Sequence, residues 1–173
     1  MQPEGLIAVG RLTKPHGLWG EVVFLPYVYD LELLPDLVQQ QVFLQQGQAP
    51  LHTATILEWR VAHKRVLVRL HGCKEIATAE ALRGYEVFIP RSWFAPLPAG
   101  EYYWFEIEGL AVYAHDGCYL GPVVEIIYTG SNDVYVVRNG SQETLIPALR
   151  DVIQSIDLAR GAIHLYPVAG WLD

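Results

Sequence analysis

In the second half of the chain, short apolar segments alternate with turn residues, and this pattern constrains the fold more than any other feature. Asn139-Gly140 separates two runs of alternating residues, and Asp116-Gly117 separates two more. Both dipeptides favour the tight turns that join antiparallel strands, because their residues tolerate positive φ angles. We expect two hairpins here and a third strand pair around residues 158–161. The predicted strands are 110–113, 119–128, 133–138, 142–146, 152–156 and 162–166.

The first half shows the same kind of pattern with one helical interruption. In 65–70 the alternation places Val66, Val68 and Leu70 on one face of a strand. Asp30 is a typical cap for a short helical turn that Pro35 would stop, and Gly84 is a typical helix end. Strands are predicted over 6–13, 21–25, 41–45, 51–59, 65–70 and 85–89, with a helical turn over 30–37 and a helix over 75–82.

Short strands in succession predict a mainly β fold class, with two small antiparallel β-barrels joined by a short linker. We place the first barrel at residues 1–93 and the second at residues 101–173. The linker between them, residues 94–100, contains two prolines. Residues 171–173 form a tail after the last strand.

Composition excludes several classes of protein. Hydrophobic residues make up 51% of the 173 and charged residues only 18%, which supports a buried core and argues against disorder. The first residues lack the charge and apolar run of a signal peptide, and no apolar stretch is long enough to span a membrane. We therefore expect a soluble, cytoplasmic protein, acting as a monomer and without a membrane partner.

The two cysteines, Cys73 and Cys118, are far apart in the sequence and form no Cys-x-x-Cys pair. Metal sites built on cysteine usually need closely spaced ligands, so we expect no metal and no cofactor. In a cytosolic protein both thiols should be reduced, and a disulfide between them is the minor alternative.

The negative charge of the chain is concentrated in its second half. Residues 1–95 carry nine basic and nine acidic side chains, whereas residues 96–173 carry three arginines and ten acids. The net charge of -7 therefore belongs to the second part. A surface of that sign repels phosphate and attracts basic proteins. The second domain is a poor candidate for binding RNA and a reasonable one for binding a basic protein.

An aromatic run, Tyr102-Tyr103-Trp104-Phe105, follows Glu101 at the start of the second domain. Alternation sends every second strand side chain to the opposite face, so we expect some of these rings to lie outside the core. Either the rings pack inside the protein, or Tyr102 or Tyr103 is an exposed anchor for a partner. We take Tyr102, Tyr103, Trp104 and Glu101 as candidate partner-binding residues.

Basic residues of the first half are candidates for contact with RNA. Lys14 and His16 lie in a Pro- and Gly-containing loop, and Arg60, Lys64 and Arg65 lie in a second basic span. The spacing of a phosphate-binding P-loop is absent, and His16 has no partner at a catalytic spacing. The second span is equally well explained as a solvated hairpin, and no aromatic ladder interleaves its charges.

No set of residues predicts catalysis. Ser131 and Asp133 lie in a loop of turn-forming residues without a neighbouring histidine, so a turn is the simpler interpretation. A metal-dependent RNA-processing enzyme would need paired acids or a nucleophile with its base at a suitable spacing, and we find neither. Two alternatives to a protein-binding module stay open, namely this enzyme and a plain RNA-binding barrel.

Several short motifs occur together in a fixed order along nearly the whole chain, and together they are specific. The chain resembles the RimM family of ribosome maturation factors in the following segments: Gly10 to Val22, Ala79 to Gly84, Glu101 to Trp104, Thr129 to Val134, Leu145 to Pro147, and Leu172-Asp173.

The resemblance implies a first barrel like those of translation factors and a second of the PRC-barrel type. It implies a non-enzymatic assembly factor, or chaperone, that matures the head of the small ribosomal subunit and supports processing of its rRNA. It also implies binding to small-subunit ribosomal protein number nineteen and to immature small subunits. In the family the adjacent tyrosines at the start of the second domain support ribosome binding, and here those are Tyr102 and Tyr103.

Overall fold

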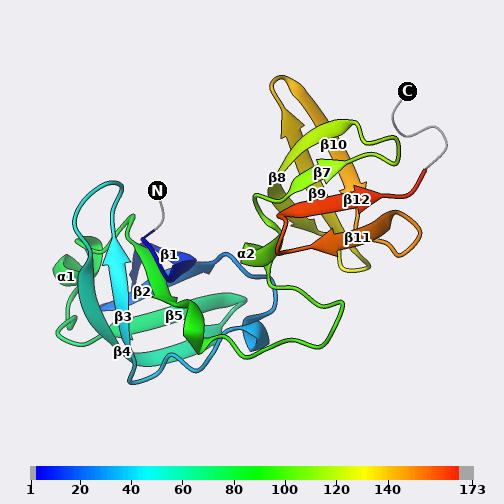
Figure 1. The fold of residues 1–173 in the computed structure, drawn as a ribbon. Coiled ribbons are helices and arrows are strands. Elements are labelled where there is room, and N and C mark those ends of the chain that lie inside the picture. Colours follow the sequence, from blue (N-terminus) through cyan, green and yellow to red (C-terminus); the bar gives the residue numbers. More distant parts are fainter. Residues whose placement is uncertain (1–2, 168–173) are drawn as a thin grey trace. The chain divides into compact units, whose positions relative to one another are not determined.

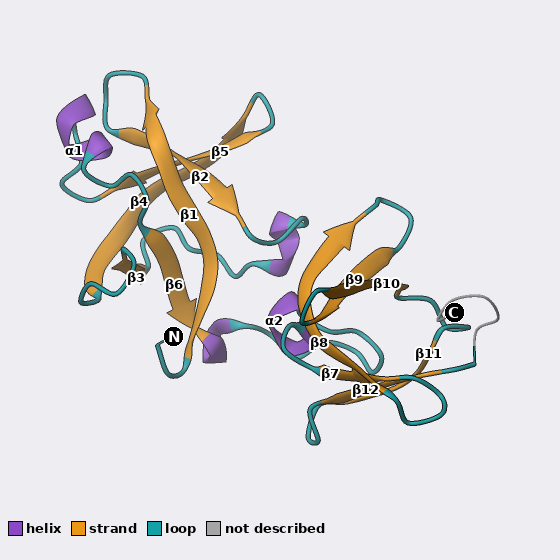
Figure 2. Ribbon diagram, turned by 90° about the horizontal axis from the view of Figure 1, so that it is seen from above, coloured by secondary structure: helices purple, strands orange, loops and turns teal. Residues whose placement is uncertain are grey.

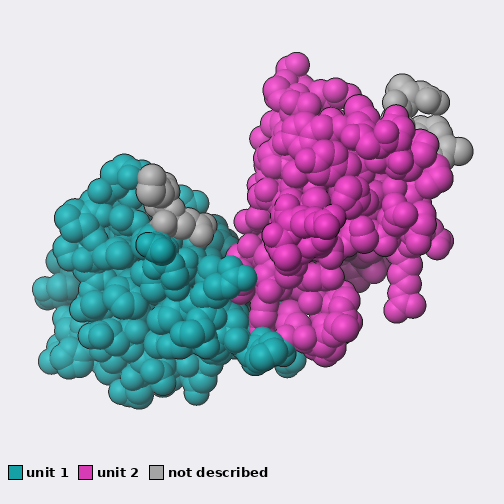
Figure 3. All heavy atoms as spheres, in the orientation of Figure 1, with its two compact units in different colours: residues 1–96 teal, residues 97–173 magenta. Residues whose placement is uncertain are grey.

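The computed structural model describes residues 3–167, and the chain forms two compact units, residues 1–96 and 97–173 (Figures 1 and 3). We call them unit 1 and unit 2. Both are built mainly from strands, so the predicted mainly β fold class is confirmed. The tail expected over 171–173, which includes the Leu172-Asp173 motif, lies outside the described residues. No helix within residues 3–167 is long and apolar enough to cross a membrane.

Unit 1 is a closed barrel in which neighbouring strands follow the order β1-β2-β5-β4-β3-β6 (Figure 1). Val66, Val68 and Leu70 are buried as predicted, and they share the barrel interior with Val22 and Phe24. The strands are β1 (Leu6–His16), β2 (Glu21–Pro26), β3 (Gln41–Gln45), β4 (His52–Ala62), β5 (Arg65–Leu70) and β6 (Glu86–Pro90).

β1 is longer than the sequence pattern predicts. The strand was expected to end at Thr13, but it continues to His16, which pairs with Glu21 of β2. The register shifts between Leu12 and Pro15. Proline has no N–H to donate to a ladder, and such an irregularity is a place where a strand tolerates it. Lys14 and His16 therefore lie on an ordered strand end and not in an irregular loop.

The short helices of unit 1 lie where the sequence predicts them but are shorter than predicted (Figure 2). In η1 (Leu31–Leu33) the carboxylate of Asp30 accepts a hydrogen bond from Glu32 N–H at 3.0 Å, as expected of a cap. Helix α1 (Ile76–Glu80) is shorter than the predicted 75–82, and the chain turns at Gly84 with φ of 85°. A further turn, η2 (Arg91–Trp93), follows β6.

Unit 2 is a six-stranded sheet with the order β10-β9-β8-β7-β12-β11 (Figure 1). The hairpins predicted from Asp116-Gly117 and Asn139-Gly140 are confirmed as β7–β8 and β9–β10. The strands are β7 (Ala111–Tyr113), β8 (Tyr119–Tyr128), β9 (Asp133–Asn139), β10 (Gln142–Pro147), β11 (Ile153–Asp157) and β12 (Ala162–Leu165).

One strand pair in unit 2 departs from the expected antiparallel meander. β12 returns beside β7 and pairs with it in parallel, with Ile163 opposite Val112. A parallel pair needs a long connection, and the strands between β7 and β12 supply it. The pairing leaves β10 and β11 as the two edges of the sheet. Ile163 and Val112 are both fully buried and lie in the core cluster of unit 2.

Candidate functional site: a groove beside the aromatic run

The aromatic run is folded around a helix that the sequence pattern did not predict. Helix α2 (Trp104–Ile107) starts within the run, and the Glu106 carboxylate accepts a hydrogen bond from Tyr103 N–H at 2.9 Å. A glutamate three residues after the N-cap residue often caps a helix in this way. This spacing is present in the sequence and is the signal that could have identified the helix. The hydrogen bond fixes the path of the chain just after Tyr102.

The two adjacent tyrosines occupy different environments. Tyr103 is only 7% exposed, and its ring stacks parallel to that of Phe105, with 5.2 Å between centroids. Trp104 is also 7% exposed and meets Phe105 edge to face. The ring of Tyr103 is therefore packed against a neighbouring ring, and its role in binding a partner stays a prediction. Tyr102 is half-buried and packs against the core cluster of unit 2.

Tyr102 and Glu101 form one wall of a groove in unit 2 with a volume of about 490 Å³. Glu101 is exposed, and Tyr135, which is buried, also contributes to the lining. The connection between β10 and β11, residues 148–150, and β11 itself also line the groove. The groove is lined by Ala99, Gly100, Glu101, Tyr102, Tyr135, Ala148, Leu149, Arg150, Ile153, Gln154, Ser155 and Ile156.

The groove combines apolar surface with acidic surroundings. Leu149 keeps 45% of its surface exposed, although it is a large apolar side chain. Burial, together with the charge of Asp133 and the neighbouring Tyr102, raises the pKa of Tyr135 to about 12. Burial also raises the pKa of Asp133. The phenol of Tyr135 is therefore neutral at physiological pH, and the charged residues of the lining are Glu101 and Arg150.

Most arginines of unit 2 are already neutralised by neighbours. Arg138 forms an ion pair with Glu143 at 2.7 Å, and Arg160 lies 3.7 Å from Asp157. Arg150 lines the groove and forms no ion pair within residues 3–167. These ion pairs cancel charge within the unit, so the excess of acidic residues sets the sign of its electrostatic field.

The candidate contact residues of unit 1 do not form a single cluster. Lys14 is exposed and His16 half-buried, and both lie near the β1–β2 turn. Lys64 and Arg65 lie at the β4–β5 turn. In the β2–β5 register, Glu21 at the start of β2 pairs with Arg69, and Phe24 near its end pairs with Val66. The β4–β5 turn is therefore near the end of β2 that is farther from the β1–β2 turn. Arg60 links the two regions, since its guanidinium binds Glu21 at 2.8 Å.

Two exposed apolar residues beside Lys14 and His16 were not singled out from the sequence. Leu18 and Trp19, in the β1–β2 turn, are 63% and 75% exposed. Single exposed apolar residues are common, but a tryptophan this exposed is an unusual surface residue. Nothing in the alternation pattern distinguishes an exposed turn tryptophan from a buried one. The groove residues Leu149, Arg150 and Ser155 were missed for a different reason, because they come together only through the fold.

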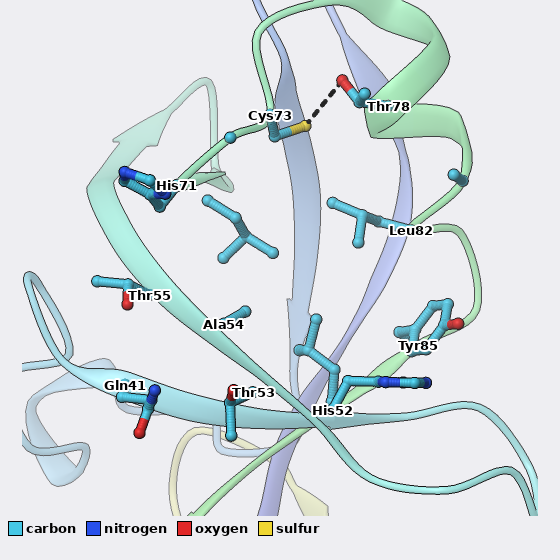
Figure 4. A pocket seen from close by; sticks show the side chains of 14 residues that line it. Gln41, His52, Thr53, Ala54, Thr55, His71, Cys73, Thr78, Leu82 and Tyr85 are labelled. Atoms are coloured by element: carbon cyan, nitrogen blue, oxygen red, sulfur yellow. Dashed lines mark hydrogen bonds between the residues drawn. The ribbon is translucent and has the colours of Figure 1, made fainter.

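A second hollow lies in unit 1, with a volume of about 650 Å³ (Figure 4). It contains His52, His71 and Cys73 in its lining, which are residue types used in catalysis and metal binding. The His52 ring contacts Tyr85 edge to face, and the Cys73 thiol donates to the Thr78 hydroxyl at 3.5 Å. No group of three or more potential metal ligands occurs within residues 3–167. The hollow has no paired carboxylates that would support acid–base or metal chemistry.

The loop over 129–133, which contains Ser131 and Asp133, is held by its own hydrogen bonds. The Thr129 hydroxyl donates to the Asn132 carbonyl at 2.6 Å, and Ser131 donates to the Asn132 side chain at 3.2 Å. These contacts are typical of a turn in which short polar side chains bond nearby backbone. The cysteines are both free, Cys73 buried in unit 1 and Cys118 exposed in unit 2.

Comparison with known proteins relates both units to one family. Residues 7–94 match the family model described as the RimM N-terminal domain, and residues 104–171 match the RimM PRC barrel domain. The "Ribosome maturation factor RimM" of Geobacter metallireducens is 38% identical over 168 residues, covering 97% of this chain and 96% of that protein. The protein of the same name from Thermotoga maritima is 38% identical over 151 residues, covering 87% and 85%.

A solved structure also matches along the chain. It is a crystal structure of a putative 16S ribosomal RNA processing protein RimM from Pseudomonas aeruginosa, which is 30% identical and gives a TM-score of 0.46. The match covers 95% of this chain and 98% of that one. With two domain models matched in order and relatives covered almost from end to end, the chain belongs to the RimM family of ribosome maturation factors.

Proposed function

We propose that this chain is a non-enzymatic assembly factor for the small ribosomal subunit, which matures the head of the subunit and supports processing of its rRNA. Family membership and the name shared by its relatives support this proposal. The chain would bind small-subunit ribosomal protein number nineteen and immature small subunits. As a member of this family it would act in the cytoplasm, as a monomer.

The observation that carries the proposal is the groove of unit 2, in which a half-buried tyrosine and apolar side chains lie within a strongly acidic unit. Ribosomal proteins are basic because they neutralise rRNA phosphates, so an acidic surface can hold one before the RNA does. Tyr102 contributes a rigid ring with a polar tip, a residue type enriched at binding hot spots. Unit 2 would hold the protein and release it as rRNA folds into place.

Unit 1 would contribute contact with rRNA. Its charges balance overall, and Lys14, Lys64 and Arg65 are exposed without an ion pair in the described part of the chain. Lysine and arginine contacts to phosphate give affinity without sequence preference. Lys14, His16, Arg60, Lys64 and Arg65 are the residues we propose for this contact.

Co-sedimentation tests this function with the full chain. The chain should sediment with immature small subunits and much less with mature ones, because the mature head leaves no unfilled site for an assembly factor. Equal sedimentation with both particles would contradict a role in maturation.

Incubation with precursor rRNA and divalent metal separates this role from that of a processing enzyme. Cleavage of the rRNA that depends on an acidic residue pair would overturn the proposal.

A further inference from the structure

β11 is an edge strand whose backbone is open on one side. It pairs with β12 on its inner side, and within residues 97–167 no strand pairs with its other side. Along a strand the N–H and C=O groups of alternate residues point to opposite sides, so about half of those in β11 are directed away from β12. The N–H of Ile153 donates to the Leu149 carbonyl at 2.8 Å, so the open part begins after Ile153.

The groove beside Tyr102 runs along this open edge. Four consecutive residues of β11, Ile153 to Ile156, line it. Successive side chains of a strand point to opposite faces, so a hollow lined by consecutive residues must border the edge of the strand and not one face. Tyr102 and Leu149 line the same groove, which has a volume of about 490 Å³.

The surroundings of the groove favour a basic occupant. Glu101 lines the groove and Asp151 is exposed just before β11, whereas Asp157 at the end of the strand is paired with Arg160. Arg150 is the basic residue of the lining, and unit 2 as a whole carries the negative excess of the chain. An unpaired strand edge is a template for pairing with another strand. In such complexes the backbone hydrogen bonds give affinity, and the neighbouring side chains give specificity for the bound sequence.

We propose that an extended, basic segment of the partner protein pairs with the open edge of β11 as an added strand. The inference rests on the proposed function, because it specifies how unit 2 holds the ribosomal protein. Alternate side chains of the segment would contact Tyr102 and Leu149, and its basic side chains would meet Glu101 and Asp151. The paired segment would be about five residues long, matching the length of β11.

Amide hydrogen exchange, measured by NMR on the labelled full chain, tests this pairing. The probe is unlabelled small-subunit ribosomal protein number nineteen. In the complex, amides of residues 154–157 that point away from β12 should exchange at least tenfold more slowly. β10, the opposite edge of the sheet, is the internal control and should keep its exchange rates.

The outcomes separate the inference from the proposed function. If the complex forms and the rates at 154–157 do not change, strand addition is wrong while the assembly role stands. If the ribosomal protein does not bind the full chain at all, the proposed partner is wrong and this inference falls with it.

Modified peptides give a second test that needs no altered protein. The partner segment protected in the complex would be synthesised with single N-methyl groups, each of which removes one N–H without changing a side chain. Strand addition predicts that methylation weakens binding at least tenfold at every second position and has little effect in between. A uniform effect along the segment would contradict the proposal.

Discussion

At the scale of single residues, the fold places two tyrosines that are adjacent in the sequence in different environments. Tyr103 is packed against Phe105, whereas Tyr102 lines the groove. Of the two candidate anchors, Tyr102 has the more accessible ring, and the ring of Tyr103 is packed. Sequence alternation could not make this distinction, because helix α2 begins directly after Tyr103 and changes the direction of the side chains.

Alanine substitution of each tyrosine separately should show this difference. Tyr103→Ala should lower the free energy of unfolding by roughly 3 kcal/mol, as is typical for a buried aromatic ring. Tyr102→Ala should cost much less stability but reduce co-sedimentation with immature small subunits at least tenfold. Urea unfolding and sedimentation of the two variants check the prediction. It is wrong if Tyr102→Ala unfolds the protein and Tyr103→Ala leaves both quantities unchanged.

The raised pKa of Tyr135 predicts a loss of stability at alkaline pH. Tyrosine in an unfolded chain loses its proton near pH 10, whereas burial and Asp133 raise the pKa of Tyr135 to about 12 in the fold. Between these values the unfolded chain binds fewer protons, so stability falls as pH rises. The urea midpoint should therefore drop between about pH 10 and about pH 12. Tyr135→Phe, which has no ionisable hydroxyl, should show a smaller drop, and an identical drop would contradict this assignment.

At the scale of secondary structure elements, the sequence predicted most of the fold. The positions of the strands follow from alternation, and the hairpins of unit 2 follow from Asp116-Gly117 and Asn139-Gly140. The parallel pairing of β12 with β7 could not be predicted in this way. Turn signals specify only sequential neighbours, whereas this pair joins segments about fifty residues apart by burying Val112 and Ile163. The groove depends on that pairing, since it makes β11 an edge.

The β1–β2 turn offers a test of how the elements are held together. Gly20 has φ of 86°, and a Cβ at this position would overlap the carbonyl oxygen of Cys73, just before α1. Gly17 has φ of 66° with no atom within 4 Å of such a Cβ. Gly17→Ala should cost about 1 kcal/mol from the left-handed backbone alone. Gly20→Ala should cost at least about 2 kcal/mol more, because backbone must move.

Thermal or urea unfolding of the two glycine variants measures this difference. Because both substitutions add the same methyl group at a positive φ, the difference reports the contact between the turn and the segment before α1. Equal losses of stability would show that the turn is not held against Cys73.

At the scale of the whole molecule, the two units divide the charge of the chain unequally. Unit 1 has balanced charge and several exposed basic residues, and unit 2 carries the acidic excess. This division was visible in the sequence, because it depends on counting and not on geometry. The location of the groove was not visible in the sequence, because Glu101 and Leu149 are distant in sequence and meet only in the folded unit.

The charge division predicts that salt slows association with the basic partner. Electrostatic steering between an acidic surface and a basic protein is screened over about 8 Å at physiological ionic strength. Raising salt from about 50 mM to 500 mM should therefore lower the association rate constant by about tenfold or more, with a smaller change in the dissociation rate. Stopped-flow measurement with small-subunit ribosomal protein number nineteen checks this. An association rate constant that does not change with salt would contradict electrostatic steering.

The most direct test of the account is the equilibrium dissociation constant of that ribosomal protein for the full chain and for two variants. Tyr102→Ala alters the groove of unit 2, and Lys64→Ala alters the exposed β4–β5 turn of unit 1. The account predicts that Tyr102→Ala weakens binding at least tenfold and that Lys64→Ala changes it less than twofold. Binding that is lost with Lys64→Ala but unchanged with Tyr102→Ala would contradict it.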